Sequence, residues 1–279
     1  MSYKNILVVV DNGPRAAQNV RLAVHLAKTY EAHLTGLYAA SLPAGVVGFD
    51  GGYVPDPLLM LSKQLEEAAI AAHQIFDAEV ARVDGVLTEW RQHIGSAITS
   101  VCVNARYHDL VIMGQFDPQH PQSGVPVDLA EGVVLGAGRP VLVVPYAGDF
   151  DHIGQRILIG WDAGREATRA VTDALPFLRR AEHTTVMTAW PEISDMAHGE
   201  SAGADIALFL ARHGVNVEVK REPGVGLNVG ELLLSVAADV DVNLLVMGLY
   251  GHSRLRELML GGASHAILHS MTVPVLMSH

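Results

Sequence analysis

The chain has 279 residues, of which 49% are hydrophobic, and a formal net charge of −11. This length and apolar content allow one large domain or two domains of ordinary size, each with a substantial core. The acidic balance excludes the basic surface that binding to nucleic acid or to an anionic membrane requires, so neither is expected as a partner. The first apolar run, residues 6–10, is too short for a signal-peptide core or a membrane helix and is typical of a strand.

Strands and helices alternate along the first half. Apolar residues at helical spacing predict a helix over 16–30. We predict further helices over 65–83 and 96–105, and strands over 33–38, 87–90, 110–113 and 141–144. The segment 41–63 contains three prolines and four glycines. It is predicted to be an irregular loop, which either covers the top of the sheet or is a surface excursion without function.

The sequence contains an internal repeat. Two segments of the first half recur in the second: 6–11 as 157–162, and 109–114 as 243–248. The two spacings are 151 and 134 residues, so the first half carries 17 extra residues, which fall within 41–63. We therefore predict a tandem duplication with domains at 1–147 and 153–279.

The order of the elements predicts an α/β fold. Each of the two tandem Rossmann-like domains is expected to hold a five-stranded parallel sheet with helices on both faces. The last strands of the two halves, 141–144 and 275–277, have edges that can pair within one chain, and further association into a homodimer is left open. Pro176 lies inside the expected helix 167–181, where its missing N–H predicts a kink.

The stretch 242–264 carries the clearest functional signal. An apolar strand ends at Gly248, and Gly251 and Gly261 follow at the spacing Gly-x2-Gly-x9-Gly. Glycines allow several backbone N–H groups to converge on one anion, and a helix expected after Gly261 would direct its positive end toward the same anion. The spacing is neither that of a P-loop nor the G-x-G-x-x-G dinucleotide fingerprint. We interpret the stretch as a strand that feeds a phosphate-binding loop.

This motif, placed after a buried strand, resembles that of the universal stress protein family, whose ATP-binding members carry the same spacing followed by Ser or Thr. The resemblance extends over both halves. It implies an adenine nucleotide alpha hydrolase-like fold, a cytoplasmic role in the stress response, and binding of ATP or another adenine nucleotide, with or without magnesium. By motif position, Asp162 would contact the adenosine end of the ligand. The residues that would surround its phosphates are Gly248, Gly251, Gly261, Gly262 and Ser264.

Several of these residues allow a second interpretation. Gly262 stands where the family pattern has Ser or Thr, so a hydroxyl is lost there that Ser264 either replaces or does not. Asp162 can instead cap the helix that follows it. Arg254 and Arg256 lie between the glycines, where they either screen phosphate charge or are solvated loop residues.

The first half has lost this motif. At the spacing of 134 residues, Asp117 and Asp128 stand where the second half has Gly251 and Gly262. Carboxylates at these positions would repel phosphates. The segment 115–126 also contains three prolines, which lack the N–H groups that an anion needs. We therefore predict one nucleotide site per chain and a degenerate first half that serves pairing, regulation or another ligand.

The sequence predicts neither a catalytic residue nor a metal site. His265 and His269 are spaced i, i+4 without a third ligand and are expected to be exposed helix residues. Cys102 lies between two valines and is expected to be a packed core thiol. As the single cysteine it cannot form an internal disulfide, which fits a reducing cytoplasm. No motif joins a nucleophile to a nearby base.

Three functions remain open at this point. The first is a nucleotide-binding regulatory protein in which ATP occupancy biases the second domain and its partner surface. The second is a slow ATPase or an adenylyl-handling enzyme that uses the same pocket, with at most weak ATP hydrolysis or autophosphorylation. The third is a nucleotide-free interaction or small-ligand module with a vestigial glycine loop.

Overall fold

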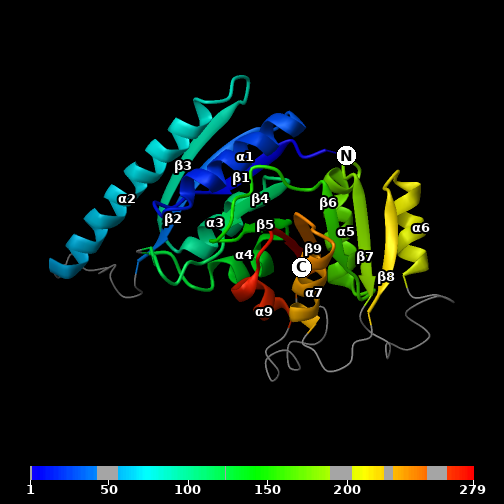
Figure 1. The fold of residues 1–279 in the computed structure, drawn as a ribbon. Coiled ribbons are helices and arrows are strands. Elements are labelled where there is room, and N and C mark those ends of the chain that lie inside the picture. Colours follow the sequence, from blue (N-terminus) through cyan, green and yellow to red (C-terminus); the bar gives the residue numbers. More distant parts are fainter. Residues whose placement is uncertain (1, 43–55, 123, 189–202, 223–228, 250–262) are drawn as a thin grey trace. The chain divides into compact units, whose positions relative to one another are not determined.

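The computed structural model describes residues 2–42, 56–122, 124–188, 203–222, 229–249 and 263–279 (Figure 1). They form two compact units, each described by itself: the first unit is Tyr3–Ala137, and the second unit is Gly138–His279 together with Ser2. Five residues of the predicted phosphate loop lie outside the described residues: Gly251, Arg254, Arg256, Gly261 and Gly262.

The first unit is built on parallel strands in the order β3-β2-β1-β4. The strands are β1 (Asn5–Val9), β2 (His33–Ser41), β3 (Thr88–Gly95) and β4 (Leu110–Gly114). The paired residues of β1 and β4, such as Ile6 and Leu110, are fully buried, which explains the unbroken apolar runs in the sequence. β3 is half exposed and carries charged side chains, which protect a strand from pairing with other chains.

Helices cover both faces of this sheet. They are α1 (Ala16–Tyr30), α2 (Asp56–Val80), α3 (Ala97–Ala105) and α4 (Leu129–Ala137). α1 packs against α2, and α3 packs against α4. Gly36 faces Phe76 of α2, whereas the preceding Thr35 contacts His108, just after α3. Because successive strand residues point to opposite faces, the two helix pairs lie on opposite sides of the sheet.

The prediction of an irregular loop over 41–63 is wrong for its last part. α2 begins at Asp56, so residues 56–63 are helical. Pro57 does not prevent this, because a proline in the first turn of a helix has no intrahelical N–H bond to lose. The helix therefore begins one residue before the last proline of the segment and includes the apolar run 58–61. Met60 of that run remains 66% exposed.

The second unit is built on strands in the order β5-β10-β9-β6-β7-β8. They are β5 (Val141–Val144), β6 (Arg156–Gly160), β7 (His183–Thr188), β8 (Val217–Arg221), β9 (Leu244–Gly248) and β10 (Val275–Ser278). The neighbours from β10 to β8 are parallel, but β5 runs antiparallel to β10, with Val143 opposite Val275. The pairing predicted for these two final strands is confirmed.

The helices of the second unit are α5 (Arg165–Leu178), α6 (Ala204–Arg212), α7 (Val229–Asp239) and α9 (Ala263–Ser270). α5 packs on β9 and β10, α6 on β8, and α7 on α9. α5 includes Pro176 and ends at Leu178, three residues before the predicted end. The missing N–H of the proline leaves only the Thr172 carbonyl without its helical bond.

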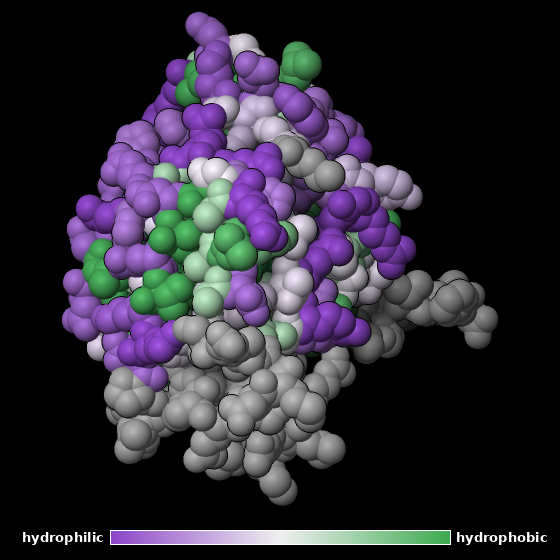
Figure 2. All heavy atoms as spheres, turned by 90° about the vertical axis from the view of Figure 1, so that its right-hand side faces the viewer, coloured by the Kyte–Doolittle hydropathy of each residue, from purple (hydrophilic) through white to green (hydrophobic). Residues whose placement is uncertain are grey.

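The surface on the side of α6 shows apolar residues among polar ones (Figure 2). On α6 itself, Leu208 and Phe209 are 50% and 38% exposed. Among the described residues, no helix combines the length and the apolar character needed to cross a membrane.

The two units begin their fourth strands in the same way. Before β9, the Asn243 side-chain oxygen accepts hydrogen bonds from the backbone N–H groups of residues 154, 155 and 156, at 3.0 to 3.1 Å. Before β4, an Asp109 carboxylate oxygen accepts from the N–H groups of Lys4 and Asn5, at 2.7 and 2.9 Å. Each acceptor ties the start of the fourth strand to the start of the first, which sets the register of the sheet centre.

Candidate functional site

The strand order of the second unit reverses between β6 and β9. β6 continues to β7 on one side and pairs with β9 on the other, with Ile159 opposite Val246. In a parallel sheet of this kind, ligands bind outside the carboxyl ends of the strands at the point of reversal. β6 ends at Gly160 and β9 ends at Gly248, so Asp162 follows the end of one of these neighbouring strands and Gly248 ends the other. That the two residues share one ligand stays a prediction.

Asp162 is held by the start of α5. Its Oδ1 accepts a hydrogen bond from the Gly164 N–H at 2.8 Å, which closes the turn before α5, but Asp162 is not the helix cap of the second interpretation, because the N-cap residue is Gly164. Gly164, the N-cap residue of α5, provides no side-chain cap, so the first turn presents its N–H groups and positive dipole end at this edge of the sheet. Arg165 follows with an 84% exposed side chain that pairs with Glu166 at 3.2 Å. Sequence reasoning missed both of these charged residues, because neither belongs to the glycine motif.

Gly248 has a packing role that the sequence did not reveal. A Cβ atom at this position would lie 2.5 Å from the Ala167 nitrogen and 2.6 Å from the Glu166 carbonyl carbon. These are backbone atoms of α5 and cannot rotate away. Glycine is therefore required here so that the first turn of α5 can approach the end of β9.

Ser264 lies in the first turn of α9 and is only 2% exposed. α9 is positioned by a close contact with α7, where a Cβ on Gly230 would lie 2.8 Å from the Ala263 carbonyl oxygen. The structure thus places Asp162 and Gly248 at the carboxyl ends of two neighbouring strands, β6 and β9, and Ser264 at a helix start. The positions of Gly251, Gly261 and Gly262 relative to them stay a prediction.

The first unit repeats the beginning of this arrangement. Asp11 follows β1, and its Oδ1 accepts from the Gly13 N–H at 2.8 Å, as Asp162 does from Gly164. Burial raises the pKa of the Asp11 carboxyl, against the opposing effect of the Gly13 hydrogen bond. The turn after the first strand is therefore the same in both halves.

The loop after β4 in the first unit differs from a phosphate cradle. Its Asp117 carboxylate accepts from the Gln119 N–H and contacts His120 Nδ1, at 2.8 and 2.9 Å, and the histidine contact lowers the pKa of Asp117. Further along, the Gly124 carbonyl accepts from the Ser41 N–H at 2.6 Å. The loop is thus organised by its own side chains and attached to the end of β2.

Tyr38 lies near the same edge, toward the end of β2. Its side chain is 1% exposed, and its hydroxyl finds no hydrogen-bond partner among the described residues. Burial, with a smaller contribution from the nearby Asp11 carboxyl, raises the pKa of Tyr38 to about 12. The phenol is therefore neutral at physiological pH, and its polar end is buried close to a carboxyl group without a bond between them.

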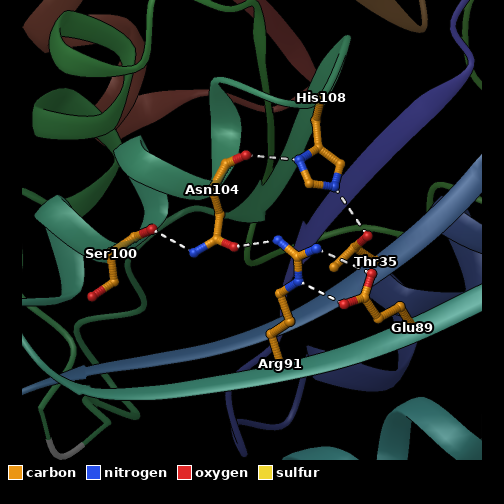
Figure 3. Close-up of polar contacts among 6 residues, drawn as sticks. All are labelled: Thr35, Glu89, Arg91, Ser100, Asn104 and His108. Atoms are coloured by element: carbon orange, nitrogen blue, oxygen red, sulfur yellow. Dashed lines mark hydrogen bonds and ion pairs between the residues drawn. The ribbon is translucent and has the colours of Figure 1, made fainter.

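A polar network lies on the other face of β2 (Figure 3). His108 contacts the Asn104 carbonyl through Nδ1 at 2.8 Å and the Thr35 hydroxyl through Nε2 at 3.0 Å. Because the carbonyl can only accept, Nδ1 carries the proton and Nε2 accepts from Thr35. Arg91 donates to the Asn104 side chain at 2.8 Å and pairs with Glu89 at 2.8 Å, which ties edge strand β3 to α3.

This network has a structural role. His108 is 4% exposed, and burial, reinforced by the charge of Arg91, lowers its pKa, so the ring is neutral. Every ring nitrogen is already engaged, and the network lies within the sheet rather than at its carboxyl edge. The network therefore stabilises edge strand β3 and is not interpreted as a binding site.

The remaining candidates from the sequence have ordinary environments. His265 and His269 are exposed, as predicted, with their rings stacked at 4.0 Å. No group of three or more metal-ligating side chains occurs in the part of the chain that the structure describes. Cys102 is buried against Gly132 and Gly136, which confirms the packed thiol, and burial raises its pKa.

The fold and the edge described above define a doubly wound α/β protein of the class that binds ligands at the carboxyl ends of its strands. The family model described as the universal stress protein family matches the chain twice, at residues 2–145 and 154–279. The chain therefore belongs to the universal stress protein family, with two such domains in tandem.

Solved structures agree with this assignment at the level of the fold. The structure of a universal stress protein from Archaeoglobus fulgidus DSM 4304 matches with a TM-score of 0.69 and 15% identity, covering 98% of this chain and 95% of that one. A functionally unknown protein from Pseudomonas aeruginosa PAO1 matches with a TM-score of 0.57 and 18% identity, covering 99% and 92%. A comparison with curated proteins gave no match.

Proposed function

We propose that this universal stress protein binds ATP or a related adenine nucleotide in its second half and acts as a regulatory protein of the stress response in the cytoplasm. The proposed binding residues are Asp162, Gly248, Gly251, Gly261, Gly262 and Ser264. The observation that supports the proposal is that β6 and β9, which are followed by Asp162 and ended by Gly248, are neighbouring parallel strands at the point where the strand order reverses. The Gly-x2-Gly-x9-Gly motif starts from that same point.

The charges at this edge suit a nucleotide in one orientation. Asp162 is an acceptor, which suits the hydroxyl and amino groups of an adenosine rather than a phosphate. The first turn of α5 and the loop glycines supply N–H donors, which suit the phosphates, and the exposed Arg165 can move toward them. Magnesium, when it accompanies ATP, neutralises phosphate charge. The residues present therefore fit an adenine nucleotide.

The proposal is tested by the nucleotide content of the full chain purified without added ligand. The protein is denatured and the supernatant is separated by ion exchange. We expect about one adenine nucleotide per chain, as for a tightly held ligand, and none in a Gly251→Glu, Gly261→Glu double variant, because two added carboxylates repel the phosphates. Added ATP, with magnesium or with a chelator, is expected to raise the melting temperature of the unmodified chain.

A matched control is available in the first half. Asp117 and Val127 occupy the positions that correspond to Gly251 and Gly261. An Asp117→Glu, Val127→Glu double variant changes the same two places and should retain the nucleotide of the unmodified chain. If the unmodified chain contains no nucleotide and ATP does not change its melting temperature, the glycine loop is not a working site and the proposal fails.

A further inference from the structure

We propose that the outer edge of β3 is a self-association surface, through which two copies of this chain pair their β3 strands antiparallel around Trp90. β3 is the last strand on its side of the sheet, with β2 as its one neighbour among the described strands (Figure 1). The inference concerns the first unit and does not rest on the nucleotide site proposed for the second half. It goes beyond that function, because it names a binding surface, its partner and the register in which they meet.

The free edge of β3 is defined by its hydrogen bonds to β2. The Leu87 carbonyl accepts from the Leu34 N–H at 2.9 Å. At the other end of the strand, the Gly95 carbonyl accepts from the Leu42 N–H, also at 2.9 Å. Because alternate residues of a strand direct their N–H and C=O groups to the same neighbour, the odd-numbered residues from 87 to 95 face β2. The even-numbered residues from 88 to 94 therefore direct these groups outward, where another strand can bond to them.

The charges on β3 select one way of pairing this edge with itself. In a two-fold antiparallel pair centred on Trp90, the outward backbone groups of the two Trp90 residues meet, and Glu89 of each copy stands opposite Arg91 of the other. Centring the pair on Glu89 or on Arg91 instead sets like charges directly opposite each other, which is unfavourable. The register around Trp90 is the one symmetric register that places each glutamate opposite an arginine.

The side chains of Glu89 and Arg91 already lie where this exchange needs them. Both lie on one face of β3 and bond to each other at 2.8 and 3.1 Å (Figure 3). They are 45% and 39% exposed, so a second copy can reach them. In the paired state each carboxylate bonds to the guanidinium of the other copy rather than to its own neighbour. The charges thus oppose arbitrary partners and favour one, an identical strand in one register.

The helix beside the edge adds apolar contact area. On the other face of β3, Trp90 stacks on His73 of α2, with ring centroids 4.6 Å apart and an interplanar angle of 6°. His73 is 44% exposed, and Ile70, one turn earlier on α2, is 59% exposed. α1 packs on the opposite side of α2, where Arg21 bonds to Glu79. The His73 side of α2 is therefore the side that an approaching copy meets, and association covers Ile70.

The corresponding strand of the second unit offers a matched comparison. In β8, Glu218 and Lys220 repeat the spacing of Glu89 and Arg91, and each glutamate is paired in register with a threonine of the neighbouring strand. β8 has five residues, however, against eight in β3. Its glutamate also accepts from the Thr185 hydroxyl of its own chain at 3.1 Å. A shorter edge with an engaged carboxylate is the weaker surface, so β8 provides the control.

The test is sedimentation of the full chain over a range of protein concentrations. The unmodified chain should pass from monomer to dimer without larger species. Glu89→Arg and Arg91→Glu, each alone, should raise the dissociation constant about 100-fold, because the two-fold axis sets two like-charged pairs across the junction. An equimolar mixture of these two variants should dimerise again, since every glutamate then meets an arginine of the other variant. A merely structural role of the pair does not predict this rescue.

Two further variants separate the surface from the charges. Lys220→Glu, the matched change in β8, should dimerise as the unmodified chain does. Gln92→Pro removes an outward N–H of β3 without removing a bond to β2, so it should fold and should prevent dimers, whereas Gln92→Thr should not. Melting curves identify a variant that does not fold. If a charge variant is unfolded, the comparison of Gln92→Pro with Gln92→Thr decides.

Several outcomes would overturn the inference. They are a chain that stays monomeric at every concentration, dimers that persist in both single charge variants, and a mixture of folded variants that stays monomeric. Loss of the dimer in Lys220→Glu would assign the interface to β8, and assemblies larger than a dimer would indicate that β3 meets β8 of the next copy. Nucleotide content is measured on the same samples, so failure of the proposed function is recognised separately and leaves this inference standing.

Discussion

In the first half, β2 carries the buried Tyr38, and the loop after β4 is bonded to Ser41 at the end of β2; in the second half, Thr188 stands at the position equivalent to Tyr38, and the sequence after β9 is rich in glycine. Both halves nevertheless keep the aspartate turn after the first strand. The two copies thus keep the same turn after the first strand while the segments beyond their fourth strands differ in sequence. The fold depends on the strands, whereas the site depends on a few residues beyond their ends.

The largest expected effect is on the free energy of unfolding and concerns Gly248 and Gly114, the glycines that end β9 and β4. Gly248→Val should lower the free energy of unfolding by about 3 kcal/mol, because its side chain would meet the backbone of α5. Gly114→Val is the matched control and should cost less, since the nearest atom there is the movable amide nitrogen of Asn19, at 2.7 Å from the added Cβ. Chemical denaturation measures both, and equal losses would contradict the packing role of Gly248.

A smaller effect concerns the acceptors before the fourth strands. Asn243→Ala should lower the free energy of unfolding by about 2 kcal/mol, because three backbone N–H groups lose their acceptor. Asn243→Asp should stay close to the unmodified protein, since Asp109 performs this role in the first half. Thermal unfolding distinguishes the two, and an aspartate as harmful as alanine would show that the halves are not interchangeable here.

A third prediction concerns pH and applies to the first half alone. The pKa of His108 is lowered in the folded chain, so the unfolded chain binds the proton more readily. The neutral ring therefore contributes fully to the free energy of unfolding above the ordinary histidine pKa, and this contribution is lost as pH falls below that value. The free energy of unfolding changes by at most about 1.4 kcal/mol per pH unit for one proton. His33 and Arg91 oppose the proton, and Glu89 favours it.

The measurement for His108 is the free energy of unfolding between pH 7 and pH 5. His108→Gln removes the titrating group, so this variant should lose less stability over that range than the unmodified chain. Other carboxylates and histidines titrate equally in both proteins and cancel in the difference. Identical pH profiles would mean that His108 is not held neutral.

The smallest effect is expected for Tyr38→Phe. Removing a buried hydroxyl that has no partner among the described residues should change the free energy of unfolding by at most about 1 kcal/mol, toward greater stability. Denaturant titration at pH 7 is sufficient to see the direction. A clear loss of stability would show that the hydroxyl is bonded in solution, for example to a buried water molecule.

Much of this molecule was predictable from local patterns. The helix over 16–30 and the strand over 141–144 have the predicted bounds, because apolar periodicity and turn residues mark both in the sequence. The start of α2 was missed, since the glycines and prolines before it obscured a helix that a first-turn proline permits. The end of β2 was also longer than predicted, because its last residues are paired with β3 rather than marked by their own sequence.

The sequence by itself determined the duplication, the alternation of strands and helices, and the glycine motif, because each is a pattern of residue types along the chain. Only the tertiary structure showed that Gly248 is required by α5, that Asn243 and Asp109 have the same role, and that Tyr38 and Thr188 occupy equivalent positions. These facts depend on which strands are neighbours and in what register. A single chain's residue order does not encode that information locally, since it arises when segments more than a hundred residues apart pack together.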